Sequence, residues 1–88
     1  MAEKKETLKS NIKQIAALEE QETHLLIDYE IRKLIIYTNK ATIINRLARL
    51  GYMHTKQDTV DGQIYSRTYE FDTNDIKRFL KNSIFKYD

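Results

Sequence analysis

The sequence contains no cysteine, no proline and no tryptophan, and it has only two glycines among its 88 residues. Without cysteine the chain cannot form a disulfide, use a thiol in catalysis or build a cysteine-containing zinc site. Two histidines, His24 and His54, are too few for a typical histidine-rich metal site. Two glycines do not make a glycine-rich phosphate loop. We therefore expect no metal and no cofactor.

Long apolar runs are also lacking. No run approaches the roughly 20 residues that a membrane-spanning helix needs, and the first residues, Met-Ala-Glu-Lys-Lys-Glu, hold no apolar signal core. We expect a cytoplasmic protein that does not enter a membrane. A chain of 88 residues is one small domain with a thin core, which leaves little room for a catalytic pocket. No serine or histidine stands in a nucleophile or acid–base context, so we expect no catalytic residues and no enzyme activity.

Charge is distributed unevenly along the chain. Residues 1–30 carry four lysines and seven acidic residues, whereas residues 31–88 carry eleven basic and six acidic residues. The acidic part ends in a cluster of Glu19, Glu20 and Glu22. The basic part suggests a face for an anionic partner, and the two parts together suggest oppositely charged ends for self-association.

The first part of the chain has the spacing of an amphipathic helix. Leu8, Ile12, Ile15 and Leu18 recur at intervals of three and four residues and would form one apolar stripe. The spacing predicts a long helix over residues 3–22. This stripe is narrow, so the helix must pack on residues 31–88, project from them, or pair with a second copy.

Residues 23–38 carry two conflicting patterns. Ile27, Ile31, Leu34 and Ile35 have helical spacing. The run Leu34–Thr38 is β-branched and aromatic, which is typical of a buried strand. We expect a helix to about Lys33, and residues 34–38 fit a helix or a strand equally well.

The second half of the chain is clearer. Ile43, Ile44, Leu47 and Leu50 form an apolar helical face over residues 40–50, with Thr38 or Asn39 as the N-cap and Gly51 just past the end. Residues 52–71 alternate in polarity and contain an Asp-Gly pair at 61–62, which predicts a β-hairpin. The apolar spacing after Thr73 predicts a last helix over residues 73–85.

The predicted fold is a single α+β domain over residues 1–88. It has a long N-terminal helix, a central helix, a β-hairpin or small antiparallel sheet, and a C-terminal helix. If residues 34–38 form a strand, the order of elements is α-β-α-β-β-α.

Two groups of residues are candidates for a protein interface. The first is the acidic cluster. The second lies on the hairpin, where alternation brings tyrosines to one face with an arginine between them, and such residues are enriched in interfaces. The candidates are Glu19, Glu20, Glu22, Tyr65, Arg67 and Tyr69.

The segment Thr42-Ile-Ile-Asn-Arg-Leu-Ala-Arg-Leu-Gly-Tyr52 resembles the recognition helix of winged helix-turn-helix proteins, with the hairpin as the wing. The resemblance implies that the helix enters the major groove and that the wing reaches the phosphates. The DNA-contact candidates in this alternative are Lys40, Thr42, Asn45, Arg46, Arg49, Lys56 and Arg67.

We expect a small non-enzymatic module that binds a protein. The abundance of Lys, Ile, Asn, Thr and Tyr is typical of AT-rich genomes, which suggests a phage or mobile element whose small protein modulates a host protein machine. The first alternative is a winged-helix-like DNA-binding transcriptional regulator. The second is a structural homodimer through Leu8, Ile12, Ile15 and Leu18.

Overall fold

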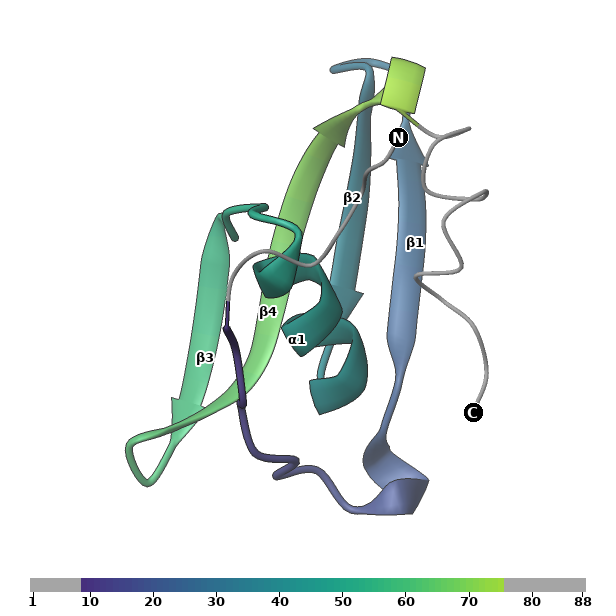
Figure 1. Cartoon of the computed structure of the whole chain (residues 1–88). Helices are drawn as coiled ribbons and strands as arrows, with labels where there is room; N and C mark the ends of the chain where they lie inside the picture. Colours follow the sequence, from purple (N-terminus) through teal and green to yellow (C-terminus); the bar gives the residue numbers. More distant parts are fainter. Residues whose placement is uncertain (1–8, 76–88) are drawn as a thin grey trace.

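A computed structural model describes residues 9–75 of the chain. The chain forms a four-stranded antiparallel sheet with one α-helix on one face (Figure 1). Its elements are the 3-10 turn η1 (Leu18–Glu20), β1 (Thr23–Asp28), β2 (Lys33–Thr38), α1 (Ala41–Arg49), β3 (Lys56–Val60), β4 (Gln63–Asp72) and the 3-10 turn η2 (Thr73–Asp75).

The strand order is β1-β2-β4-β3, so β2 and β4 lie in the middle and β1 and β3 form the edges. Ile36 of β2 pairs with Leu25 of β1 on one side and with Tyr69 of β4 on the other. We call the face that α1 covers the helix side of the sheet. The core lies between this face and α1 and consists of Leu34, Ile36, Ile43, Leu47, Tyr69 and Phe71.

The predicted central helix and hairpin are both present. Ile43 and Leu47 point into the core as expected, and Gly51 has a φ of 91°, the left-handed conformation that suits a residue just past a helix. In the hairpin, Asp61 and Gly62 have φ values of 52° and 78°. Two consecutive positive φ values are typical of the tight turn that matches the twist of paired strands.

The multi-helix fold class is wrong, because the described residues contain one α-helix and a four-stranded sheet. Residues 9–17 are not helical, and the N-terminal stripe of Ile12, Ile15 and Leu18 is not formed. Leu8 lies outside the described residues. A C-terminal helix over 73–85 is not seen at its start, where Thr73–Asp75 form η2, and residues 76–88 lie outside the described part.

The N-terminal segment, residues 9–17, lies against α1 and is held there by side-chain amides. Asn45 of α1 accepts hydrogen bonds from the Ile12 N–H (2.7 Å) and the Ser10 hydroxyl (2.7 Å), and it donates to the Ile12 carbonyl (3.0 Å). Gln14 in turn accepts from the Ala41 N–H at the start of α1 (2.8 Å). These bonds satisfy backbone groups that a helix would have paired internally, which explains why the helical spacing was misleading.

The expected helix over residues 23–33 is also wrong, and the strand alternative for 34–38 is confirmed. β1 and β2 form a hairpin whose turn contains no glycine, proline or asparagine. The Asp28 carboxylate accepts from the N–H groups of Glu30 (3.0 Å) and Ile31 (3.3 Å), and Arg32 takes a left-handed φ of 57°. Asp28 thus supplies the turn chemistry that glycine or proline usually provides.

The winged helix-turn-helix arrangement is absent from residues 9–75. In that fold a helix precedes the recognition helix and supports it, whereas here the residues before α1 form β1 and β2. The N-cap position of α1 is Lys40, not Thr38 or Asn39, and its own side chain makes no capping bond. Thr38 still contributes, because its hydroxyl accepts the Lys40 N–H (3.1 Å).

Candidate protein-interaction site

The outer side of strand β1, which we call the β1 edge, is the most unusual surface of the described structure. Leu25, Leu26 and Ile27 are 48%, 58% and 38% exposed, although all three lie in a regular strand. Leu25 and Ile27 are paired with the core residues Ile36 and Leu34, so they lie on the helix side, whereas Leu26 lies on the opposite side. The β1 edge therefore carries aliphatic side chains above and below its unpaired backbone.

Within the described part of the chain, the backbone of β1 is paired on one side only. Its six residues pair with β2, and within residues 9–75 no strand pairs with the other side. A free strand edge is a template for another strand, and natural proteins usually protect it with lysine, proline, a bulge or a covering element. Strand β1, with the sequence Thr-His-Leu-Leu-Ile-Asp, contains no lysine, proline or bulge.

The other edge strand, β3, carries charged residues and an irregularity in its pairing, which the strand β1 itself does not. All five of its residues are exposed, and they include Lys56 and Asp58. Its pairing with β4 is interrupted by a register shift between Asp58 and Thr59. Asp58 also accepts a hydrogen bond from the Ser66 hydroxyl (3.1 Å), and Gln57 accepts one from the Arg67 guanidinium (2.8 Å). A charged edge strand with irregular pairing resists strand addition, so we expect the two edges of the sheet to differ in their capacity to bind a strand.

Acidic residues lie at the beginning of β1. Glu19 and Glu20 are exposed in η1, and Glu22 directly precedes the strand. The Glu22 carboxylate lies 2.8 Å from Nε2 of His24. The acidic cluster predicted from the sequence thus lies next to the β1 edge and extends it with negative charge.

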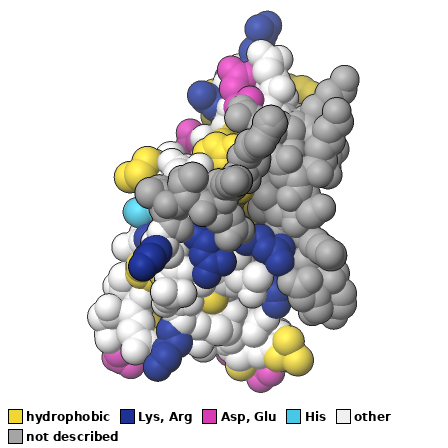
Figure 2. All heavy atoms as spheres, viewed as in Figure 1, with side chains coloured by type: hydrophobic (Ala, Val, Ile, Leu, Met, Phe, Trp, Pro, Cys, Tyr) yellow, Lys and Arg dark blue, Asp and Glu magenta, His cyan; other side chains and the backbone are white. Residues whose placement is uncertain are grey.

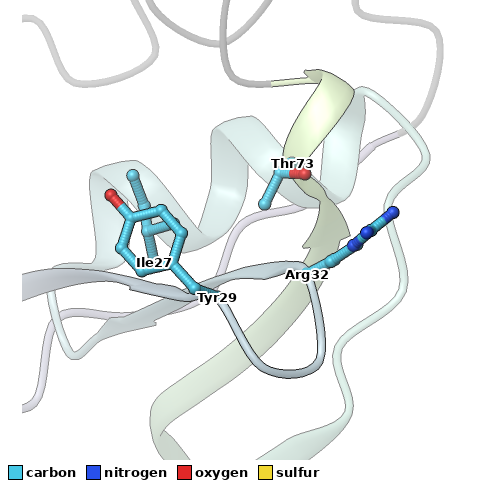
Figure 3. Close-up of a pocket in the computed structure, with 4 residues that line it drawn as sticks. All are labelled: Ile27, Tyr29, Arg32 and Thr73. Atoms are coloured by element: carbon cyan, nitrogen blue, oxygen red, sulfur yellow. The ribbon is translucent and has the colours of Figure 1, made fainter.

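A shallow pocket lies at the other end of β1, at the turn to β2. It is lined by Ile27, Tyr29, Arg32 and Thr73. The Ile27 and Tyr29 side chains lie together beside the strand end, and Arg32 extends away from them (Figure 3). Tyr29 is 83% exposed and the nearby Ile31 is also exposed. The apolar surface of the β1 edge therefore continues into this turn.

The position of β1 is fixed by the buried side chain of Asn39, at the end of β2. Its Oδ1 accepts the Glu22 N–H (2.7 Å), and its Nδ2 donates to the Glu20 carbonyl (2.9 Å) and the Tyr65 hydroxyl (3.3 Å). Asn39 is only 2% exposed. The sequence suggests Asn39 only as a helix cap, because its hydrogen-bond partners are distant in sequence.

The hairpin candidates are only partly accessible. Arg67 and Tyr69 share the helix side of β4, but Tyr69 is fully buried in the core, while Arg67 and Tyr65 are half-buried. Nearby, the His54 ring packs edge-on against Tyr69. Burial, and secondly the charge of Arg67, lower the pKa of His54 below the ordinary histidine value. The folded chain therefore prefers neutral His54, and its protonation below about pH 6.5 opposes folding.

The DNA-contact candidates do not form one exposed row on α1. Asn45 is buried and bonded to the N-terminal segment, and Arg49 donates to the Ser10 carbonyl (3.0 Å). Thr42 is exposed and Arg46 is half-buried. The remaining candidates, Lys40, Lys56 and Arg67, lie before α1, on β3 and on β4.

Comparison of the chain with models of protein families, with curated proteins and with solved structures finds no match. Within residues 9–75 no helix is long and apolar enough to cross a membrane. Among the same residues, no group of three or more His, Asp or Glu side chains is placed to hold a metal ion.

Leu25 and Leu26 are not among the residues predicted from the sequence, and the spacing of Ile27 predicts a helical face instead of a strand. The signal was the run of three consecutive aliphatic residues between His24 and Asp28, which is short enough for a strand. A sequence does not reveal which strand will lie at the edge of a sheet, so it did not show that these side chains would be exposed.

Proposed function

We propose that this chain is a small non-enzymatic protein-binding module and that the β1 edge is its binding site. The partner would add an extended strand to the sheet, as in other cases of β-strand addition. The observation that carries the proposal is that, among residues 9–75, no strand pairs with the outer side of β1, where Leu25, Leu26 and Ile27 are exposed on both of its faces. Backbone hydrogen bonds would supply affinity, and these side chains would supply selectivity.

The chemistry of the site also describes the strand that it would accept. Aliphatic side chains of the incoming strand would pack on Leu25 and Ile27 on one face and on Leu26 on the other. A basic residue at one end would lie beside Glu19, Glu20 and Glu22. Composition is the basis for proposing that the protein belongs to a phage or mobile element and modulates a protein machine of the host. The cytoplasmic location is a prediction from the sequence.

Selection of displayed random peptides on the immobilised protein tests this proposal. We expect selected peptides to carry alternating aliphatic residues and a terminal Lys or Arg. Leu26→Lys should weaken their binding at least tenfold, because lysine on an edge strand opposes strand addition. The matched control is Val60→Lys on the β3 edge, where Val60 is similarly exposed (44%) and binding should not change. Equal binding by both variants, or a selection that yields no peptide, would contradict the proposal.

Nucleic-acid binding is the second candidate, and a cluster of basic side chains supports it. Figure 2 shows Lys and Arg side chains gathered over α1, in the middle of the helix side. The basic residues of α1 and its N-cap are Lys40, Arg46 and Arg49, and the exposed Lys9 and Lys13 belong to the N-terminal segment that is hydrogen-bonded to α1. Because Asn45 is bonded to Ser10 and Ile12, we expect contact with phosphates and no base reading.

Fluorescence anisotropy of a labelled mixed-sequence duplex, at about 50 and 200 mM salt, distinguishes this candidate from the first. Phosphate contacts release counterions, so binding should weaken steeply with salt, and Lys13→Ala should lower the salt slope by about one. Lys33→Ala, on the side of the sheet away from α1, is the control and should leave the slope unchanged. No binding at low salt would eliminate this candidate.

A further inference from the structure

We infer that the strand which pairs with the β1 edge is β1 of a second copy of this chain. The inference rests on the proposed function, since it requires the β1 edge to be a binding site for a strand. The two copies would be related by a two-fold axis, so that β1 pairs antiparallel with itself and the two sheets become one. This interface differs from the predicted homodimer stripe, since Ile12 and Ile15 are half-buried and not on a helix.

The sequence of β1 is complementary to itself in one register. A two-fold axis at Leu26 places Leu26 opposite the second copy's Leu26 and Leu25 opposite the second copy's Ile27. Both aliphatic pairs then lie on matching faces, because residues directly opposite in an antiparallel pair point to the same side. At the ends of the paired segment, His24 lies opposite the second copy's Asp28, a base opposite an acid.

Neighbouring registers fit less well. An axis at Leu25 would place Leu26 opposite the second copy's His24 and Ile27 opposite the second copy's Thr23, so only Leu25 would keep an aliphatic partner. An axis at Ile27 would place Leu26 opposite the second copy's Asp28 and lose an aliphatic pair. In the register centred on Leu26, Glu22 lies opposite the second copy's Glu30, and both residues are outside β1, Glu30 in the turn that also carries Arg32.

The same register keeps both helices on one face of the joined sheet. Leu25 and Ile27 are on the helix side in each copy, so their pairing aligns the two helix sides. The exposed turn residues Tyr29 and Ile31 lie just beyond the paired strands and would add apolar contact. One pair of short strands buries less than a standard interface of about 1,600 Å², so we expect a dimer that dissociates in the micromolar range.

Sedimentation velocity of the full chain over about 1–500 µM tests the dimer. The wild type and Val60→Lys should shift from monomer to dimer over this range. Leu26→Lys should remain monomeric, with a dissociation constant raised at least tenfold, and its circular dichroism should be unchanged because the Leu26 side chain is 58% exposed. A dimer that persists in Leu26→Lys would overturn the inference.

Disulfide trapping tests the register, and because the chain has no natural cysteine, no competing disulfide can form. Directly opposite residues in an antiparallel pair have Cα atoms about 4.5–5.5 Å apart, within disulfide reach. Under mild oxidation Leu26→Cys should therefore cross-link with itself, and a mixture of Leu25→Cys and Ile27→Cys should give the mixed dimer. Val60→Cys is the control and should cross-link at least tenfold more slowly. Equal rates at positions 26 and 60 would overturn the inference.

The proposed function and this inference fail in different ways. If the wild type stays monomeric to 500 µM while selected peptides still distinguish Leu26→Lys from Val60→Lys, the second copy is excluded and the β1 edge remains a site for another protein. If the wild type is monomeric and no peptide depends on Leu26, both are wrong. A dimer that Leu26→Lys dissociates supports both.

Discussion

Replacement of Leu47 by alanine is expected to lower the free energy of unfolding by about 3 kcal/mol, because it removes a fully buried side chain and leaves a cavity. The core holds few side chains, and Leu47 on α1 contacts the cluster formed by β2 and β4. A domain of this size has only about 5–10 kcal/mol of stability in total, so the loss should lower the Tm by at least about 12 °C.

Thermal and urea unfolding monitored by circular dichroism measure this effect. Leu18→Ala is the matched control, because it deletes the same side-chain atoms at a position that is 79% exposed. The control should change stability by less than about 0.5 kcal/mol. A loss below about 1 kcal/mol in Leu47→Ala would show that α1 does not pack on the sheet as described.

Asn39→Ala should cost nearly as much, about 2–3 kcal/mol, although it removes no apolar contact. Its side chain satisfies the Glu22 N–H and the Glu20 carbonyl, and no other side chain in the described structure bonds to either group. Both bonds are partly buried, and leaving such polar groups unpaired costs more than a hydrogen bond contributes. Because these groups lead directly into β1, the variant should also loosen that strand.

Two measurements separate the effects of Asn39→Ala. Urea unfolding gives the global loss, and amide hydrogen exchange should show faster exchange at Glu22 and along β1 than along β4. Asn11→Ala, at an exposed asparagine of the N-terminal segment, is the control and should change neither quantity. If Asn39→Ala and Asn11→Ala behave alike, Asn39 does not anchor β1.

The parts of the fold that could be predicted are those determined by local chemistry. The apolar face with Ile43 and Leu47, the left-handed Gly51 and the Asp61-Gly62 turn each identify their element without reference to distant residues. Each is a pattern whose physical cause lies within a few residues of chain.

The parts that could not be predicted depend on contacts between distant residues. Residues 9–17 have helical spacing, but Asn45 and Gln14 replace their internal hydrogen bonds with bonds to α1. The turn at 29–32 depends on the Asp28 carboxylate and on a left-handed Arg32, neither of which is a usual turn signal. Because the sequence gives no sign of this turn, the spacing of Ile27 and Leu34 fits one face of a helix.

For the same reason, only part of the candidate site could be predicted from the sequence. The acidic cluster was found from composition, and it does flank the β1 edge. Tyr69 was chosen as a contact residue, yet it is fully buried, because alternation identifies a face of a strand without telling whether that face is covered. Leu25 and Leu26 became candidates only once the strand order placed β1 at an edge.

The strand order also sets the sequence of events as the chain folds. Each of the hairpins β1–β2 and β3–β4 joins neighbouring segments, and such hairpins form in about 1–10 µs. The central pairing of β2 with β4 joins residues as distant as Lys33 and Asp72, and long-range pairings form later because more chain entropy is lost. During synthesis, both edges of the β1–β2 hairpin are therefore expected to stay unpaired until β4 has left the ribosome.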